Sequence, residues 1–301
     1  MTASLSQTGH VLVLHNVSAG GGMRREEEQR IIRAFFDART LPCTIIAFDR
    51  SHQTIASLNL AEHVQKTGAN RLLVAGGDGT IREVVEYMVK QAVKIPIGIL
   101  PTGSANLLAR IVGIPRTLED ALTHAQRAEP HAMDIGILND RHVFLLCACF
   151  GQFARVSLDA EGYWKRRFGF WGYVTAGVRH LIWFHRSAVR IQGERINAHS
   201  VLCFLREPAR AVLPALIHGE EGLQTWAPRS RTIVGLLCTL FECTVLRRAN
   251  PSGLTCIASE TLTMEGNQPL PLHLDGDRIE AEEHRRTHTM SVRRQAIAFL
   301  R

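Results

Sequence analysis

A glycine-rich turn that contains one carboxylate is the strongest chemical signal in the sequence. An apolar run ending at Val74 is typical of a buried strand; GGDGT, residues 76–80, follows, and apolar residues recur at helical spacing from Ile81. Glycines bring backbone amides close to an anion and a helix start adds positive potential, so this strand–turn–helix unit suits phosphate. Asp78 would repel a bare phosphate, so a divalent cation or hydrogen-bond donors would have to lie between them.

The simpler interpretation is an ordinary turn in an α/β domain, with Asp78 capping its helix. Two further turns favour a binding site: VSAGGG, residues 17–22, follows an apolar strand at 11–16, and PTGSAN, residues 101–106, follows another at 95–100. Turns that follow successive parallel strands lie along one edge of the sheet, where α/β folds bind ligands. The spacing therefore predicts three loops that meet around one ligand.

Four motifs occur in the order of a known family. GGDGT and the later ILPTGSANLLAR resemble the diacylglycerol kinase catalytic domain superfamily, which includes sphingosine and ceramide kinases and bacterial lipid kinases. HNVSAGGG, residues 15–22, is similar to its nucleotide loop, and LHLDGD, residues 272–277, is similar to its late Asp-Gly-Glu motif. The resemblance extends over nearly the whole chain, and GGDGT is its most specific element.

The resemblance implies an ATP site, a Mg²⁺ ion and a catalytic base. Asp275 and Asp277 flank one glycine in the late acidic turn, which would take the proton of the attacking hydroxyl, although Asp-Gly alone is also a favoured hairpin turn. Glu221 lies where relatives place a structural Mg²⁺ ligand, but these residues alone favour a solvated acidic turn. The implied nucleotide-binding residues are Asn16, Ser18, Gly20, Gly76, Gly77, Asp78, Gly79, Thr80, Gly103, Ser104 and Asn106.

Several positions depart from the family pattern. Val17 replaces a proline, Arg82 and Leu107 replace asparagines, and Asp277 replaces the glutamate of Asp-Gly-Glu. GGDGT and an acidic turn are kept, so the sequence favours an active kinase. Altered substrate choice or lost activity remain the alternatives.

The composition is that of a globular protein with an anionic partner. The chain has 301 residues, 46% hydrophobic residues and a net charge of +7, and its uncharged stretches are too short to cross a bilayer as a helix. Its seven cysteines form no CxxC pair, so we expect reduced thiols. The N-terminal sequence lacks the basic region of a signal peptide, and we expect a cytoplasmic protein.

The periodicity predicts an α/β domain followed by a β-rich domain. Strands at 11–16, 44–48, 72–74 and 94–100 alternate with helices at 24–39, 55–67 and from 81 onward, which predicts a parallel sheet with helices on both faces. Thr117 is a predicted helix N-cap. We place the domain boundary at residue 130, giving an α/β nucleotide-binding domain, 1–130, and a mainly antiparallel β-sandwich for the lipid substrate, 131–301, with the final strand packing back on the first domain. The strands predicted there are 133–138 and 143–150, a hairpin turning at Asn139-Asp140, then 188–192, 200–205, 232–245 and 253–264.

An aromatic and basic segment interrupts the predicted β region. Tyr163 to Arg186 holds three of the four tryptophans beside lysine and arginine, a mixture that suits a membrane interface. The alternative is that these aromatic rings pack between the domains. We expect transient contact with the inner face of the membrane, no nucleic-acid partner and, as an option, a homodimer.

Three functions remain open from the sequence. The first is an ATP- and Mg²⁺-dependent kinase that transfers the γ-phosphate to a lipid alcohol such as diacylglycerol, with the GGDGT loop facing the acidic turn of the other domain. The second is a soluble enzyme similar to NAD kinase, which uses related glycine loops. The third is a catalytically degenerate regulator that binds nucleotide or lipid.

Overall fold

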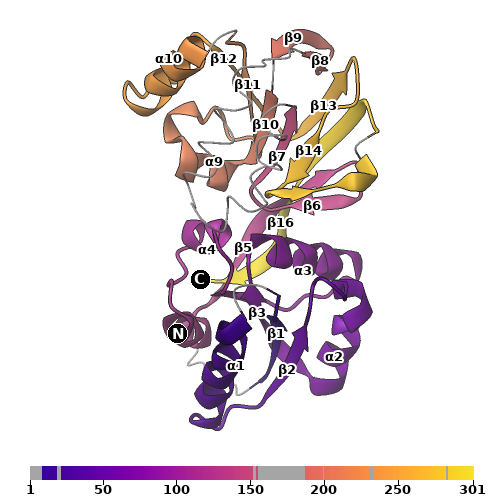
Figure 1. Ribbon diagram of the computed structural model, residues 1–301, viewed down its shortest axis with the longest axis vertical. Coiled ribbons are helices and arrows are strands. Elements are labelled where there is room, and N and C mark those ends of the chain that lie inside the picture. The colour runs from indigo at the N-terminus through magenta and orange to yellow at the C-terminus, as the bar shows by residue number, and fades with distance from the viewer. Residues whose placement is uncertain are drawn as a thin grey trace. The chain divides into compact units, whose positions relative to one another are not determined.

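Two compact units make up the chain in the computed structural model (Figure 1). The first comprises Met1–Asp134 and Arg294–Arg301, and the second comprises Ile135–Arg293. The structure describes residues 9–18, 22–151, 154, 187–198, 200–230, 233–282 and 284–301. Gly20 and the segment Tyr163 to Arg186 therefore lie outside the described residues. No helix in the described ranges is both long enough and apolar enough to span a bilayer.

The first unit alternates strands and helices. In chain order it contains β1 His10–Asn16, α1 Gly22–Asp37, β2 Cys43–Phe48, η1 Ile55–Leu58, α2 Leu60–Thr67, β3 Ala69–Gly76, α3 Asp78–Lys90, β4 Ile97–Pro101, α4 Leu107–Ile111 and α5 Leu118–Arg127, with parts of β5 Pro130–Leu138 and β16 Thr287–Leu300.

The strands of the first unit form a parallel sheet in the order β2-β1-β3-β4. The central residues of β1, β3 and β4 are apolar and almost fully buried, as expected for strands covered by helices on a parallel sheet, whereas most of the edge strand β2 is only partly buried. Gly76 pairs with Pro101, so β3 and β4 end at the same level and their loops leave the same edge. The end of β16 adds a further parallel strand beside β4, where Phe299 pairs with Ile97. The sheet confirms the predicted α/β class.

Two details show how the local sequence sets helix boundaries in this unit. The Thr117 hydroxyl accepts the N–H of Asp120, which confirms the predicted N-cap of α5. The helix predicted over 55–67 is instead a 3₁₀ turn, η1, followed by α2. Asn59 separates them because it adopts a left-handed conformation with φ of 48°, which a continuous helix does not permit.

The second unit is rich in strands. It contains the rest of β5 and β16, together with β6 His142–Phe144, β7 Cys147–Gly151, β8 Ser187–Ile191, β9 Glu194–Ala198, β10 Ser200–Leu205, α9 Arg206–Val212, η2 Pro214–Leu216, β11 Leu223–Pro228, α10 Ile233–Thr244, β12 Leu254–Ser259, β13 Thr261–Gly266, β14 Leu272–Leu274, β15 Asp277–Arg278 and η3 Glu280–Glu282.

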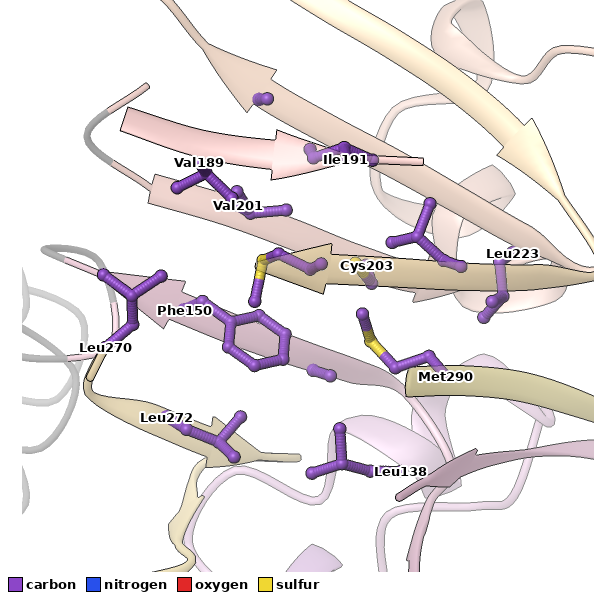
Figure 2. Close-up of a cluster of buried hydrophobic side chains, with 14 of the residues drawn as sticks. Leu138, Phe150, Val189, Ile191, Val201, Cys203, Leu223, Leu270, Leu272 and Met290 are labelled. Carbon is purple, nitrogen blue, oxygen red and sulfur yellow. The ribbon is translucent and has the colours of Figure 1, made fainter. Parts of the chain in front are cut away.

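Two groups of antiparallel strands enclose the core of the second unit. One is ordered β12-β11-β10-β7-β14-β15, and the other runs β16-β13-β8-β9. Phe150 and Cys203 from the first group meet Met264 and Met290 from the second in one buried cluster, part of which Figure 2 shows. Alternating inward-facing residues on both layers are the packing of a β-sandwich. This confirms the predicted antiparallel β architecture.

The sequence was wrong about three segments of this unit. The range 232–245 is predicted as a strand, but residues 233–244 form helix α10, whose buried Thr239 and Cys243 lie four residues apart on one face. Short apolar runs fit both the helical and the strand periodicity, so the sequence alone does not distinguish them, and tertiary packing stabilises the helix here. Residues 143–150 form two strands in different layers, β6 and β7, and 253–264 likewise form β12 and β13.

Candidate functional site

Side chains from two of the glycine-containing loops are joined directly in the first unit. The Asn16 amide at the end of β1 donates to the Thr80 hydroxyl over 2.8 Å, and both residues are buried. The Asn16 side-chain oxygen accepts the backbone N–H and the hydroxyl of Ser18, at 3.0 and 2.7 Å. These bonds fix the β1 loop against the first turn of α3.

The first turn of α3 presents backbone amides at the edge of the sheet. The helix starts at Asp78 with Gly77 as its N-cap, so GGDGT covers the last strand residue, the cap and the first helical turn. The amides of a first turn have no acceptor within their own helix, and the helix dipole adds positive potential there. This is the arrangement that binds phosphate oxygens.

The Asp78 carboxylate holds the neighbouring loop. One of its oxygens accepts the N–H of Leu107 at 2.9 Å and the other accepts that of Leu108 at 2.8 Å, at the start of α4. Asp78 was expected to cap its own helix, α3. It caps the start of α4 instead. The negative charge of Asp78 suggested a cation beside it. The two N–H donors stabilise part of that charge without a cation.

Close backbone packing explains the glycines. A Cβ on Gly103 would lie 2.4 Å from the Gly77 Cα, closer than real side chains allow, so this contact between the loops requires glycine at 103; a Cβ on Gly77 would lie 3.3 Å from the Gly103 Cα, which is tight. Asn106 shapes the third loop, because its side chain accepts the N–H of Gly103 and donates to the carbonyl of the same residue. Ser104 is exposed at the tip of this loop.

Arg50 joins the site although no sequence motif points to it. Its backbone N–H donates to the Ser18 hydroxyl at 3.1 Å, and its guanidinium donates two bonds, of 3.1 and 2.7 Å, to one carboxylate oxygen of Glu83 on α3. Arg50 follows β2, so a fourth parallel strand also ends at this edge. Its position depends on sheet order, which a single sequence does not show.

Arg82 occupies the position where the family pattern has asparagine. Its side chain is buried on α3 and forms ion pairs with Glu86 at 3.4 Å and Glu83 at 3.8 Å. The guanidinium is therefore engaged by carboxylates of its own helix, which suits a role in supporting α3.

The acidic turn lies in the second unit and has its own carboxylate clamp. Asp275 and Gly276 form a two-residue turn between β14 and β15 with φ of 52° and 94°. The Asp275 carboxylate accepts the N–H groups of Leu145, Leu146 and Cys147 at 2.7, 2.8 and 2.9 Å. These bonds fall where the predicted strand 143–150 breaks, so Asp275 holds the crossing between β6 and β7.

Asp277 and His273 lie on the strands that flank this turn. Asp277 is half-buried, and His273 is 3% exposed with neither ring nitrogen hydrogen-bonded. Burial lowers the pKa of His273 to about 4, and the Asp277 charge opposes this only in part. His273 is therefore neutral at physiological pH. The sequence analysis did not single out His273. The available signal was its position inside the LHLDGD motif, two residues before Asp275.

Glu221 stands in a turn folded around Gln224. The Gln224 amide donates to the carbonyls of His218 and Glu221, at 3.0 and 3.1 Å. One carboxylate oxygen of Glu221 is buried without a hydrogen bond, which fits a cation ligand. Within the described ranges, however, no group of three or more acidic, histidine or cysteine side chains is placed to hold a metal ion.

The expected site residues thus fall into two sets. The first unit gathers Asn16, Ser18, the GGDGT residues, Gly103 and Asn106 at one sheet edge, with Ser104 at a loop tip. The second unit holds Asp275 and Asp277 in one turn and Glu221 in another. The nucleotide and catalytic roles implied by the resemblance stay predictions.

Comparison with known proteins supports the motif interpretation. The family model described as diacylglycerol kinase catalytic domain matches residues 10–138. The lipid kinase YegS of Escherichia coli (strain K12) is 31% identical over 138 residues, covering 45% of this chain and 46% of the relative. "Probable lipid kinase YegS-like" of Enterobacter sp. (strain 638) is 27% identical over 189 residues, covering 62% and 60%. The matched parts therefore span about half of these relatives' lengths.

Solved structures share the fold over the full length. A diacylglycerol kinase from Bacillus anthracis str. Sterne aligns with a TM-score of 0.74, covering 99% of this chain and 98% of that one, at 15% identity. At that identity the likeness establishes the fold alone. Together with the family match over residues 10–138, it confirms the resemblance of this chain to the diacylglycerol kinase catalytic domain superfamily.

Proposed function

We propose that the chain is an ATP- and Mg²⁺-dependent kinase that transfers the γ-phosphate to the hydroxyl of a lipid alcohol such as diacylglycerol. The observation that carries the proposal is the first turn of α3, whose amides lie among loops held in place by Asn16, Asp78 and Gly103. The family match over residues 10–138 and the names of the relatives support a lipid as the acceptor.

Nucleotide binding follows from the loops of the first unit. The α3 amides and the Ser18 and Thr80 hydroxyls are donors suited to phosphate oxygens, and rigid loops position the γ-phosphate. Mg²⁺ bound to the nucleotide supplies charge neutralisation during transfer. The Glu221 turn offers one carboxylate oxygen to a second, structural Mg²⁺.

Phosphoryl transfer also needs a base. The lipid oxygen forms a bond to the γ-phosphorus, the bond to the β-phosphate oxygen breaks, ADP leaves, and the hydroxyl proton passes to a carboxylate. We assign this proton to the turn of Asp275 and Asp277. Because three amides fix Asp275, it also positions Asp277 on the adjoining strand. The proposal requires this turn to meet the phosphate loops in the working enzyme, at the inner face of the membrane.

A labelled-phosphate assay over a panel of acceptors tests the function. We expect label from [γ-³²P]ATP to enter diacylglycerol, a long-chain base or a phospholipid. Transfer to NAD instead would identify an enzyme similar to NAD kinase, and nucleotide binding without any transfer would identify a degenerate regulator. Either outcome would overturn the proposal.

A matched pair at Thr80 tests the phosphate site. Thr80→Val keeps the side-chain shape but removes the hydroxyl that accepts the Asn16 amide, whereas Thr80→Ser keeps the hydroxyl. We expect Thr80→Val to weaken ATP binding about tenfold by calorimetry, the loss of roughly 1.4 kcal/mol. Thr80→Ser should bind nearly as well as the wild type, and equal affinities for both variants would contradict the assigned role.

A further inference from the structure

The C-terminal end of helix α10 and the turn after it carry an exposed apolar cluster made of Leu240, Phe241, Val245 and Leu246. These four side chains are 51%, 53%, 62% and 49% exposed. In the described part of the chain only two other large apolar side chains, Leu107 and Val212, are comparably exposed. Exposed apolar residues are normal when scattered, so their concentration within seven residues is what calls for an explanation.

The helix is anchored by its smaller residues. Thr239 and Cys243 are 6% and 4% exposed, and Cys243 packs in a cluster with Trp226 and Leu216 of the same unit. By the 100° turn per residue, Phe241 lies opposite this face and Leu240 lies to one side of it, while Val245 and Leu246 follow the end of the helix. Thr239 and Cys243 therefore face the unit, and the exposed apolar side chains gather at the C-terminal end of α10. Figure 1 shows α10, in orange, at the edge of that unit.

The charges around the cluster are basic. Between Pro228 and Pro251 the sequence has four arginines and one acidic residue, Glu242. Glu242 is 17% exposed and pairs with Arg248 at 2.9 Å, whereas Arg247, next to Leu246, is exposed. An apolar surface bordered by arginine matches an anionic lipid surface, into which the apolar groups insert while the cations meet the headgroups.

From this complementarity we propose that the end of α10 and the turn after it dock the protein on anionic membranes through Leu240, Phe241, Val245 and Leu246, with Arg247 at the headgroups. A second copy of this chain fits less well, because a two-fold interface brings identical patches together and would place arginines of like charge near one another. The inference deepens the proposed lipid kinase function by naming the surface that reaches the substrate's membrane. It concerns a different segment from Tyr163 to Arg186.

Vesicle co-sedimentation without nucleotide tests docking by itself. The probes are vesicles of phosphatidylcholine alone and vesicles containing phosphatidylglycerol, with wild type, Phe241→Ser/Val245→Ser, and Phe241→Leu/Val245→Ile as the matched apolar control. We expect the serine variant to bind anionic vesicles at least tenfold more weakly, and the control to bind like the wild type. Wild-type binding should weaken on pure phosphatidylcholine and at high salt, and Arg247→Gln should bind anionic vesicles more weakly than the wild type.

Three results would overturn this inference. They are equal vesicle binding by all variants, wild-type binding that ignores lipid charge, and a wild-type dimer in solution that the serine variant converts to monomer without change in vesicle binding. Thermal melting checks that each variant is folded. We expect all variants to fold, because the side chains of Phe241 and Val245 are exposed.

Kinase assays separate this inference from the proposed function. With a short-chain diacylglycerol dissolved as monomer, the serine variant should keep wild-type turnover, because docking is then unnecessary. With vesicle-borne diacylglycerol it should lose about the same factor as it loses in binding. If the wild type phosphorylates no lipid yet binds anionic vesicles through α10, the proposed function fails and the docking inference stands.

Discussion

Two aspartates, one in each unit, perform the same local task with different consequences. Asp78 accepts two amides from the start of α4, and Asp275 accepts three from the crossing between β6 and β7. Asp78 begins a helix, so holding the next loop leaves the helix's own first amides directed at the site. Asp275 sits in a tight turn of positive φ, so holding the crossing fixes the strand that carries Asp277.

The difference teaches that a motif aspartate need not act through its charge on a substrate. In the first unit the carboxylate accepts two backbone amides and joins the GGDGT turn to the start of α4. In the second unit it joins the two layers of the sandwich at the point where the chain crosses between them. Substitutions at Asp78 and Asp275 should therefore lower the free energy of unfolding and the activity by different amounts.

The largest expected effect is that of Asp275→Asn. Asparagine tolerates the left-handed turn, but it offers one acceptor oxygen where three amides need partners, and its NH₂ would face an N–H. We expect the free energy of unfolding in urea to fall by about 2–4 kcal/mol. Phosphoryl transfer should fall about a thousandfold, with ATP affinity unchanged.

Asp140→Asn is the matched control, because Asp140 lies exposed in another turn of positive φ in the same unit. Asp140→Asn should change neither the free energy of unfolding nor the rate of phosphoryl transfer. Normal turnover in Asp275→Asn would refute the assignment of the base to this turn, and normal stability would refute the clamp.

A pH-dependent effect should come from the histidine beside the second clamp. The pKa of His273 is lowered to about 4 by burial, against 6.5 ordinarily. As pH falls from about 6.5 to about 4, the unfolded chain gains a proton that the folded chain does not, so the unfolding free energy falls by about 3 kcal/mol from this group. Burial also lowers the pKa of His288 in the same unit, which adds to the trend.

Substituting His273→Phe should flatten the stability profile between pH 4 and 6.5, as measured by urea unfolding at several pH values. His131→Phe, at an exposed position, should leave the slope as in the wild type. An unchanged slope in His273→Phe would show that this side chain is not the source of the acid sensitivity.

The smallest effect should be that of Asp78→Asn. One amide oxygen can still accept one of the two α4 amides, so we expect the unfolding free energy to fall by about 1–2 kcal/mol. ATP affinity should fall about tenfold because the third loop shifts, which calorimetry measures. Glu119→Gln is the control, an exposed acid in the first turn of α5. If Asp78→Asn cost more stability than Asp275→Asn, the ranking of the two clamps would be reversed.

The sequence alone determined the parallel sheet, the helix after GGDGT and the cap at Thr117, because these follow from local periodicity and turn chemistry. The structure starts this helix at Asp78, three residues before the predicted start, and it alone shows that Gly77 and Gly103 pack together. The sequence failed for α10, where an apolar run fits either a helix or a strand, and for residues 143–150, where the chain crosses from one layer to the other within an apolar run.

Only the tertiary structure decided what the site's polar groups contact. That Asp78 binds α4, that Asp275 binds the β6–β7 crossing and that Arg50 joins Ser18 are contacts between segments far apart in the chain. A hydrogen bond depends on which backbone groups the folded chain leaves without partners, and that is set when distant strands and loops pack together. Residue types and spacing fix the available donors and acceptors, and packing chooses among them.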